Sequence, residues 1–304
     1  MQLPKSVSVF APAKINLTLH VTGQRADGYH LLDSIVAFAD VGDDLFIQIG
    51  NTLSVTTEGP EAAAVPADMN NLVLQVARLF KDMPGASFLL TKRLPVSSGI
   101  GGGSADAAAA FRGLMTFWSG GEVAAELYEP HRTPMSKALL KLGADIPMCL
   151  LSQAARIGGI GEEISPLPGM PPIDAVLVNP RRAVSTPAVF GAMQERSSPA
   201  MAQTLPSFAG FNDFVLWLAG QRNDMQSAAI ALEPSIATVL TALQSDDSCR
   251  LARMSGSGAT CFGLYQGADA AKAAADTLQL NHPDWWVVAT KIGSQTARAL
   301  PRVR

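Results

Sequence analysis

The segment from Pro95 to Ala107 is the part of this 304-residue chain whose residue types most clearly indicate chemistry. It places four glycines within five positions, Gly99 and Gly101 to Gly103, just before an alanine-rich run with the composition of a helix. Glycine is favoured where a backbone approaches a ligand closely or adopts a positive φ. The first amides of a helix have no partner within it and carry partial positive charge. The segment therefore predicts an anion site, and a triphosphate is the usual occupant.

Two well-known phosphate loops do not fit this segment. A Walker A loop needs a Lys-Ser/Thr pair after its glycines, and a dinucleotide-binding loop needs a third glycine where Ser104 stands, within a βαβ unit. The alternative interpretation is a flexible loop or a tight helix-packing turn. A second string of small residues, from Met254 to Thr260, predicts by itself only a tight hairpin.

Periodicity predicts the elements that must position the loop. Strict alternation predicts a half-buried strand over 13–21, with Lys14 and Asn16 on its polar face. Further strands are predicted at 34–39, 44–49, 53–57, 88–91, 175–178 and 285–290, with a strand-turn-strand over 254–264. Helices are predicted at 71–81, 105–118, 122–128, 136–142, 214–219, 225–243 and 270–278. A meander followed by mixed strands and helices indicates an α+β fold. The glycine- and proline-rich stretch 158–169 predicts a boundary between domains 1–162 and 163–304.

Composition restricts the class of protein. Hydrophobic residues make up 48% of the chain and charged residues 16%, which predicts a sizeable core and argues against disorder. The net charge of −3 gives no basic footprint for a nucleic acid or a membrane surface. The three cysteines are far apart and lack zinc or redox spacing. We expect a cytoplasmic monomer or homodimer with no nucleic-acid or membrane partner.

Three segments in this order and spacing give the chain a family resemblance. They are Ala11-Pro12-Ala13-Lys14-Ile15-Asn16-Leu17, the Pro95–Ala107 loop and the Ser255–Thr260 turn. Together they resemble the GHMP kinases. The resemblance implies a two-domain α+β fold, with an N-terminal domain of the type shared with a ribosomal protein and a ferredoxin-like C-terminal domain. It also implies ATP and Mg²⁺ as cofactors.

The resemblance also implies catalytic roles. Lys14 matches the family lysine that stabilises the transferring phosphoryl group and orients Asp145, and Asp145 matches the general base for the acceptor hydroxyl. Thr186 matches a third residue of this centre. Without the resemblance, Lys14 would be a solvated strand charge, Asp145 a turn residue, and Thr186 the N-cap of a helix starting at Pro187.

Binding roles follow in the same way. Three further segments, Asp27–Leu32, Gly143–Pro147 and Ser185–Pro187, narrow the resemblance to one branch whose acceptor is a cytidine diphosphate-bearing polyol. The implied acceptor-binding residues are Asn16, Tyr29, His30, Asp145 and Phe190, of which the three rings hold the cytidine. The implied ATP-binding residues are Pro95, Ser97, Ser98, Gly99, Ile100, Gly101, Gly102, Gly103, Ser104, Ala105, Asn71, Leu72 and Lys92. Lys92 could instead be a solvated strand end.

The metal ligands are a separate hypothesis. Ser104 is the candidate ligand of Mg²⁺. Asp106 replaces the asparagine that often follows in this family, and its carboxylate in the first helical turn would repel ATP phosphates unless a cation intervenes. We therefore expect Asp106 to support Mg²⁺ through water.

Three other functions remain open from the sequence. One is a GHMP kinase for mevalonate, homoserine or a sugar, although such an enzyme has no reason to carry Tyr29, His30 and Phe190 together. A second is a catalytically inactive nucleotide-binding protein, against which Lys14 and Asp145 argue. A third is RNA binding, which the mild negative charge disfavours.

Overall fold

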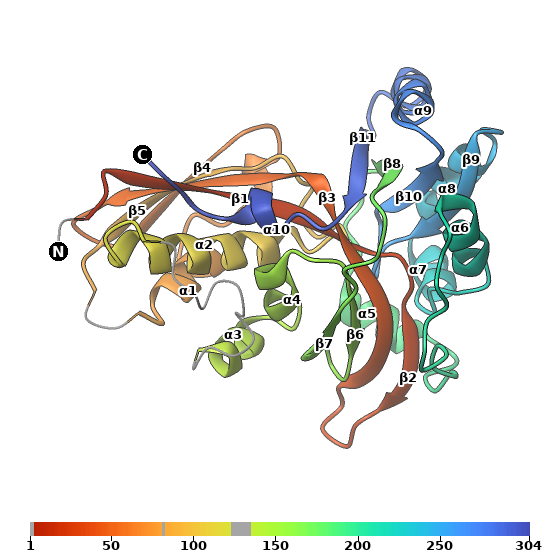
Figure 1. Ribbon diagram of the computed structural model, residues 1–304, viewed down its shortest axis with the longest axis horizontal. Helices are drawn as coiled ribbons and strands as arrows, with labels where there is room; N and C mark the ends of the chain where they lie inside the picture. Colours follow the sequence, from red (N-terminus) through yellow and green to blue (C-terminus); the bar gives the residue numbers. More distant parts are fainter. Residues whose placement is uncertain (1–2, 81–82, 123–134) are drawn as a thin grey trace.

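The computed structural model describes residues 3–80, 83–122 and 135–304, and their strands form one sheet that runs through two lobes (Figure 1). The main path through the sheet is β12-β1-β3-β11-β8-β10-β9. Its strands are β12 (Arg302–Val303), β1 (Ser6–Asn16), β3 (His30–Ile49), β11 (Trp286–Gly293), β8 (Ile173–Asn179), β10 (Cys261–Tyr265) and β9 (Cys249–Met254). Strand β3 pairs with β11, so it joins the two lobes.

The N-terminal lobe completes its sheet with strands that pair around β3. Strand β2 (His20–Gln24), β5 (Ala86–Thr91) and β6 (Ala155–Gly158) pair directly with β3. Strand β4 (Ser54–Glu58) pairs with β5, and β7 (Glu163–Pro166) pairs with β6. The helices are α1 (Leu72–Ala77), α2 (Gly102–Trp118), α3 (Ser136–Leu142) and α4 (Ile146–Leu151), besides one short 3₁₀ turn (Ala62–Ala64). The last segment of the chain, with α10 (Thr296–Ala299) and β12, returns to this lobe (Figure 1).

The C-terminal lobe has the ferredoxin-like order that we expected. Its four strands follow the spatial order β11-β8-β10-β9, which is 4-1-3-2 in chain order. Its helices are α5 (Thr186–Ala192), α6 (Phe211–Ala219), α7 (Gln226–Leu232), α8 (Ser235–Gln244) and α9 (Ala268–Asn281). The predicted boundary after residue 162 falls in the turn between the paired strands β6 and β7, and it stays a prediction.

The first predicted strand is wrong in extent and in burial. Strand β1 ends at Asn16, because the amides of Leu17 and Thr18 both approach the carbonyl of Ile35. The polar face is also buried, with Lys14 4% exposed and Thr18 fully buried. The apolar face, with Ala13 and Ile15, packs in a core, whereas Lys14 and Asn16 on the polar face line the cavity described below. A second error is the predicted helix over 225–243, which breaks at Pro234 into α7 and α8.

Other predicted elements agree closely. Helix α3 has the bounds that we predicted, and β9 and β10 form the predicted strand-turn-strand. The predicted helix over 122–128 lies outside the described residues, apart from Glu122. In the part of the chain that the structure describes, no helix combines the length and apolar character needed to cross a bilayer.

A buried ion cluster connects the start of α2 to the sheet. The ammonium of Lys92 lies 2.6 Å from Asp43 Oδ2 and 2.6 Å from Asp106 Oδ2. Asp43 Oδ1 accepts hydrogen bonds from the backbone amides of Arg93 and Leu94, which lead into the glycine loop. Asp43 on β3 therefore fixes both the lysine and the chain that follows it. The predicted alternative of a solvated strand end at Lys92 is wrong, since its side chain is 3% exposed.

The cluster holds two carboxylates against one ammonium. Asp106 Oδ1 is buried without a hydrogen-bond partner. Burial, opposed by Lys92 and reinforced by Asp43, raises the pKa of Asp106 from 3.8 to about 7. A proton on Asp106 thus relieves the excess negative charge inside the protein.

This cluster predicts a pH-dependent contribution to stability. Because the pKa of Asp106 is raised in the folded state, folded Asp106 keeps a proton that the unfolded chain releases. Protonated Asp106 therefore stabilises the folded state at low pH, and this stabilisation is lost as the pH rises. We expect the free energy of unfolding of the wild type, relative to Asp106→Asn, to fall as pH rises from about 4 to about 7, by at most about 4 kcal/mol. Urea unfolding across this range measures it. Asp276→Asn, which changes an exposed carboxylate on α9, is the control. Parallel pH curves for wild type and Asp106→Asn would contradict the prediction.

Candidate functional site

The glycine loop adopts the backbone that its composition predicts. Gly101 has a φ of 65° and is the N-cap of α2, which begins at Gly102 and has no side-chain cap for its first amides. A Cβ at Gly101 would lie 3.1 Å from the Lys14 side chain. The helix starts earlier than we predicted, so Asp106 lies in its second turn, and the predicted placement in the first turn is wrong.

The late glycine turn lies against this loop. A Cβ added to Gly99 would come within 2.6 Å of the Ser255 carbonyl oxygen and 2.7 Å of that of Gly258. The Ser255 hydroxyl donates to the Gly99 carbonyl at 3.1 Å and accepts from the Asn16 backbone amide at 3.1 Å. The turn between β9 and β10 therefore packs against the glycine loop. The sequence of the turn alone did not predict this contact.

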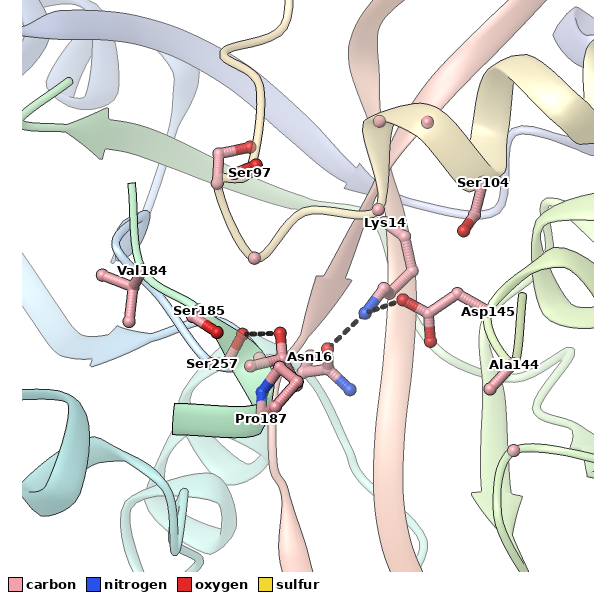
Figure 2. A pocket seen from close by; sticks show the side chains of 18 of the residues that line it. Lys14, Asn16, Ser97, Ser104, Ala144, Asp145, Val184, Ser185, Pro187 and Ser257 are labelled. Atoms are coloured by element: carbon pink, nitrogen blue, oxygen red, sulfur yellow. Dashed lines mark hydrogen bonds and ion pairs between the residues drawn. The ribbon is translucent and has the colours of Figure 1, made fainter. Parts of the chain in front are cut away.

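Lys14 and Asp145 meet beside the loop. Lys14 Nζ lies 3.0 Å from Asp145 Oδ2 and donates to Asn16 Oδ1 at 2.7 Å (Figure 2). The side-chain nitrogen of Asn16 in turn donates to the Ser34 hydroxyl at 2.8 Å. Asp145 precedes α4 and keeps 38% of its side chain exposed, whereas Lys14 is almost fully buried. The pair thus presents an accessible carboxylate with its oxygen oriented by a fixed ammonium.

These residues line one cavity of about 1250 Å³ between the lobes. All the predicted site residues line it except Ile100 and Ala105, whose side chains are buried in the core. Ile100 contributes through its backbone instead, because its carbonyl accepts a 2.9 Å hydrogen bond from the Lys14 amide. Figure 2 shows Ser104 on the same side as Asp145, and Ser257 and Ser185 on the opposite side.

Thr186 occupies the wall opposite Asp145. Its hydroxyl is 2.7 Å from that of Ser257, so α5 and the late glycine turn meet there. Ser185, not Thr186, is the N-cap of α5, and its hydroxyl accepts from the Ala188 amide. The alternative interpretation of Thr186 as that cap is therefore wrong.

The predicted aromatic group is present, but two of its rings are already in contact. His30 stacks on Phe190 with ring centroids 4.1 Å apart and planes inclined by 6°, whereas Tyr29 is 56% exposed. No third ring fits between His30 and Phe190 at this separation, so an incoming base would use Tyr29 or an outer face. Burial, together with the charge of Arg196, lowers the pKa of His30, and its buried Nε2 has no hydrogen-bond partner. A neutral imidazole in this wall can hydrogen-bond the edge of a base.

The predicted adenosine-side residues have structural partners as well. Asn71 caps α1 by accepting from the Val73 amide and donates to the Pro66 carbonyl. Leu72 and Lys92 line the same part of the cavity, near Gly102 and Gly103. Their roles in binding ATP stay predictions.

Sequence reasoning missed several lining residues. Ser34, Ser185, Arg196 and Ser257 all line the cavity, although no role was predicted for any of them. Ser257 lies within the late glycine string, so a closer look at that motif could have found it. Arg196 follows α5 with no motif around it, and only the fold brings it to the cavity.

Two family models match separate parts of the chain. A family model for the GHMP kinases N terminal domain matches residues 71–153, and a model for GHMP kinases C terminal matches residues 202–284. The chain is 57% identical over 303 residues to a 4-diphosphocytidyl-2-C-methyl-D-erythritol kinase from Roseobacter denitrificans, a match that covers 100% of this chain and 99% of that protein. It is 51% identical to the protein of the same name from Ruegeria pomeroyi, over 92% of this chain and 97% of that one.

Solved structures agree with these relatives. A crystal structure of 4-(cytidine 5'-diphospho)-2C-methyl-D-erythritol kinase superimposes with a TM-score of 0.71 at 30% identity, over 94% of this chain and 99% of that one. A homoserine kinase from Cytophaga hutchinsonii has a TM-score of 0.67 at 16% identity, over 100% and 99% of the two chains, which shows a shared fold. The two-domain α+β fold predicted above is therefore confirmed. The chain belongs to the GHMP kinases and, within them, to the 4-diphosphocytidyl-2-C-methyl-D-erythritol kinase family.

Proposed function

We propose that this protein transfers the γ-phosphoryl group of ATP to the 2-hydroxyl of 4-(cytidine 5'-diphospho)-2-C-methyl-D-erythritol. The products are the 2-phosphate and ADP, and the reaction belongs to the non-mevalonate route to isoprenoid precursors. The observation that carries this proposal is the Lys14–Asp145 pair, which lines the same cavity as a glycine loop at a helix N-terminus and a wall containing His30 and Phe190. The relatives of the same name support the choice of acceptor.

Asp145 is suited to receive the proton of the acceptor hydroxyl. Its carboxylate is accessible from the cavity, and Lys14 holds one of its oxygens. A carboxylate is a much weaker base than an alkoxide, so it orients the hydroxyl and accepts the proton late, as the bond to phosphorus forms. Lys14 then neutralises charge on the transferring group, because one N–H of its ammonium remains after those used by Asn16 and Asp145.

The phosphates of ATP are assigned to the glycine loop. Amides at the N-terminus of α2 bind anions without adding a charged side chain, and the four loop residues Gly101 to Ser104 line the cavity there. Asn71, Leu72 and Lys92 are assigned to the nucleoside side. In this arrangement the γ-phosphoryl group lies near Lys14, whose side chain would be the nearest neighbour of a Cβ at Gly101.

The cavity fits a hydrated magnesium ion bound chiefly by phosphates. Mg²⁺ keeps several waters and takes only one or two carboxylates from a kinase. Among the described residues, no cluster of three or more acidic, histidine or cysteine side chains could hold a metal by itself. Among the side-chain oxygens that line the cavity near the loop, the Ser104 hydroxyl and the Asp106 carboxyl are assigned to this cation, and Asp106 Oδ1 has no hydrogen-bond partner. The cation supplies charge neutralisation on the phosphate oxygens.

We also expect a cytoplasmic enzyme that is a monomer or a homodimer. Its cysteines are free thiols, with Cys149 and Cys261 buried, which suits a reducing compartment. Size-exclusion chromatography with light scattering measures the oligomeric state.

The acceptor specificity is tested by an ATP-consumption panel. We expect turnover with 4-(cytidine 5'-diphospho)-2-C-methyl-D-erythritol and none with mevalonate, homoserine or galactose, because only the first offers a pyrimidine to the aromatic wall. Coupled detection of ADP measures it. Turnover of another alcohol without the first would refute the acceptor while retaining the kinase, and absence of nucleotide binding would refute both.

The catalytic pair is tested by two substitutions. Lys14→Ala and Asp145→Asn should each reduce kcat by about a thousandfold or more, because each removes charge stabilisation or proton acceptance at the transition state. ATP binding, measured by calorimetry, should change little. Asp174→Asn, a partly exposed carboxylate on β8 outside the cavity, is the matched control. A rate near that of the wild type in either variant would make the assignment wrong.

The metal assignment is tested by magnesium titration of the rate. Ser104→Ala and Asp106→Asn should each raise the Mg²⁺ concentration needed for half-maximal rate by about tenfold, because each removes an oxygen near the cation. An unchanged magnesium dependence in both variants would contradict the assignment of both residues. A change in one variant alone would support a role near the metal for that residue only.

A further inference from the structure

The charged side chains that line the cavity differ in whether they have an ion-pair partner. The described residues that line it carry three cations, Lys14, Lys92 and Arg196, and three carboxylates, Asp27, Asp106 and Asp145. Lys14 is paired with Asp145, and Lys92 with Asp43 and Asp106. Asp27 is paired with Arg25, which does not line the cavity. Within the described ranges, Arg196 is thus the lining cation that has no carboxylate in ion-pair contact.

Arg196 is held in a defined place. It follows α5, and one of its terminal nitrogens donates to the Gly191 carbonyl at 3.0 Å. Two residues further on, the Ser198 amide donates to the Val21 carbonyl of β2 at 2.8 Å, which anchors the segment against the β2–β3 hairpin. The Gly191 contact uses one N–H of the five that a guanidinium carries, so donors remain for a ligand.

The side chain lies at the aromatic end of the cavity. Its positive charge acts on His30, the ring that stacks on Phe190. Those rings form the wall assigned above to the cytidine. In a cytidine diphosphate compound the first phosphate is attached to the ribose, so it must lie next to whichever wall holds the nucleoside.

We propose that Arg196 binds the diphosphate of the acceptor and thereby selects nucleoside diphosphate compounds over neutral polyols. The inference rests on the proposed function, since it assumes an acceptor that carries a diphosphate. Both lysines that line the cavity are already paired with carboxylates, so a dianion entering it is best stabilised by the cation that has no such partner. A guanidinium can donate two parallel hydrogen bonds to two phosphate oxygens. An arginine at this position therefore binds a diphosphate more tightly than a lysine would.

The proposal also explains how one cavity keeps two polyanions apart. The triphosphate of ATP is held by backbone amides and a metal ion, whereas the acceptor diphosphate is held by an anchored side chain on the other lobe. Lys14 lies between the two sites and is left to act on the transferring group. The two anion sites therefore use different chemistry, and they respond to different substitutions.

The test compares two probes, cytidine 5'-diphosphate and cytidine, by calorimetry. A non-hydrolysable ATP analogue with Mg²⁺ is present at saturation, so that the glycine loop is filled. We expect the wild type to bind the diphosphate about tenfold or more tightly than cytidine, and Arg196→Gln to lose most of this preference while its affinity for cytidine is unchanged. Arg196→Lys should recover part of it. In steady-state kinetics, Arg196→Gln should raise KM for the acceptor and leave KM for ATP unchanged.

Arg182→Gln is the matched control. Arg182 is an exposed arginine on the β8–α5 connection of the same lobe, does not line the cavity, and its substitution makes the same change in net charge. It should keep the preference for the diphosphate. If Arg196→Gln keeps the wild-type preference, the role of Arg196 is overturned and the proposed function stands. If the wild type binds neither probe while it binds ATP, the proposed acceptor and the role of Arg196 fail together.

Discussion

The backbone contact between the two glycine turns is the constraint on which the site depends. Gly99 lies so close to Ser255 and Gly258 that neither partner leaves room for a Cβ at residue 99. One turn belongs to the loop before α2, and the other joins β9 to β10 in the second lobe. The contact therefore joins the two lobes beside the cavity, which Gly99 and Gly256 line. Ser255 extends this contact to the Asn16 backbone, and the Asn16 side chain accepts a hydrogen bond from Lys14, so the position of Lys14 depends on the same contact.

The two buried lysines that line the cavity are paired in different ways. The ion cluster around Lys92 is buried and internally paired, and Asp43 uses it to fix the chain entering the glycine loop. Lys14 is paired with a carboxylate that remains accessible. Lys92 is therefore held by two carboxylates, whereas the role proposed for Lys14 is to act on the transferring phosphoryl group.

The sequence predicted the fold class and the two glycine segments because both depend on local composition and on spacing along the chain. It located Lys14 and Asp145 only through a family resemblance, since an isolated lysine or aspartate carries no local signal. It could not predict that the polar face of β1 is buried, because the residues that cover it, Gly101, Asp145 and Ser255, are distant in the sequence. Nor could it pair Lys92 with Asp43 and Asp106, which are 49 and 14 residues away. Arg196 was missed for the same reason, because its place is set by the anchoring of its segment against β2.

Direct identification of the product tests the central claim, which is phosphoryl transfer between the two halves of this cavity. The protein would be mixed with ATP, Mg²⁺ and 4-(cytidine 5'-diphospho)-2-C-methyl-D-erythritol, quenched during a single turnover, and analysed by ³¹P NMR. The account predicts one new phosphomonoester on the tertiary 2-hydroxyl, an equal amount of ADP, and an unchanged diphosphate in the acceptor. Release of ADP without that phosphomonoester, or a phosphate on another hydroxyl, would contradict it.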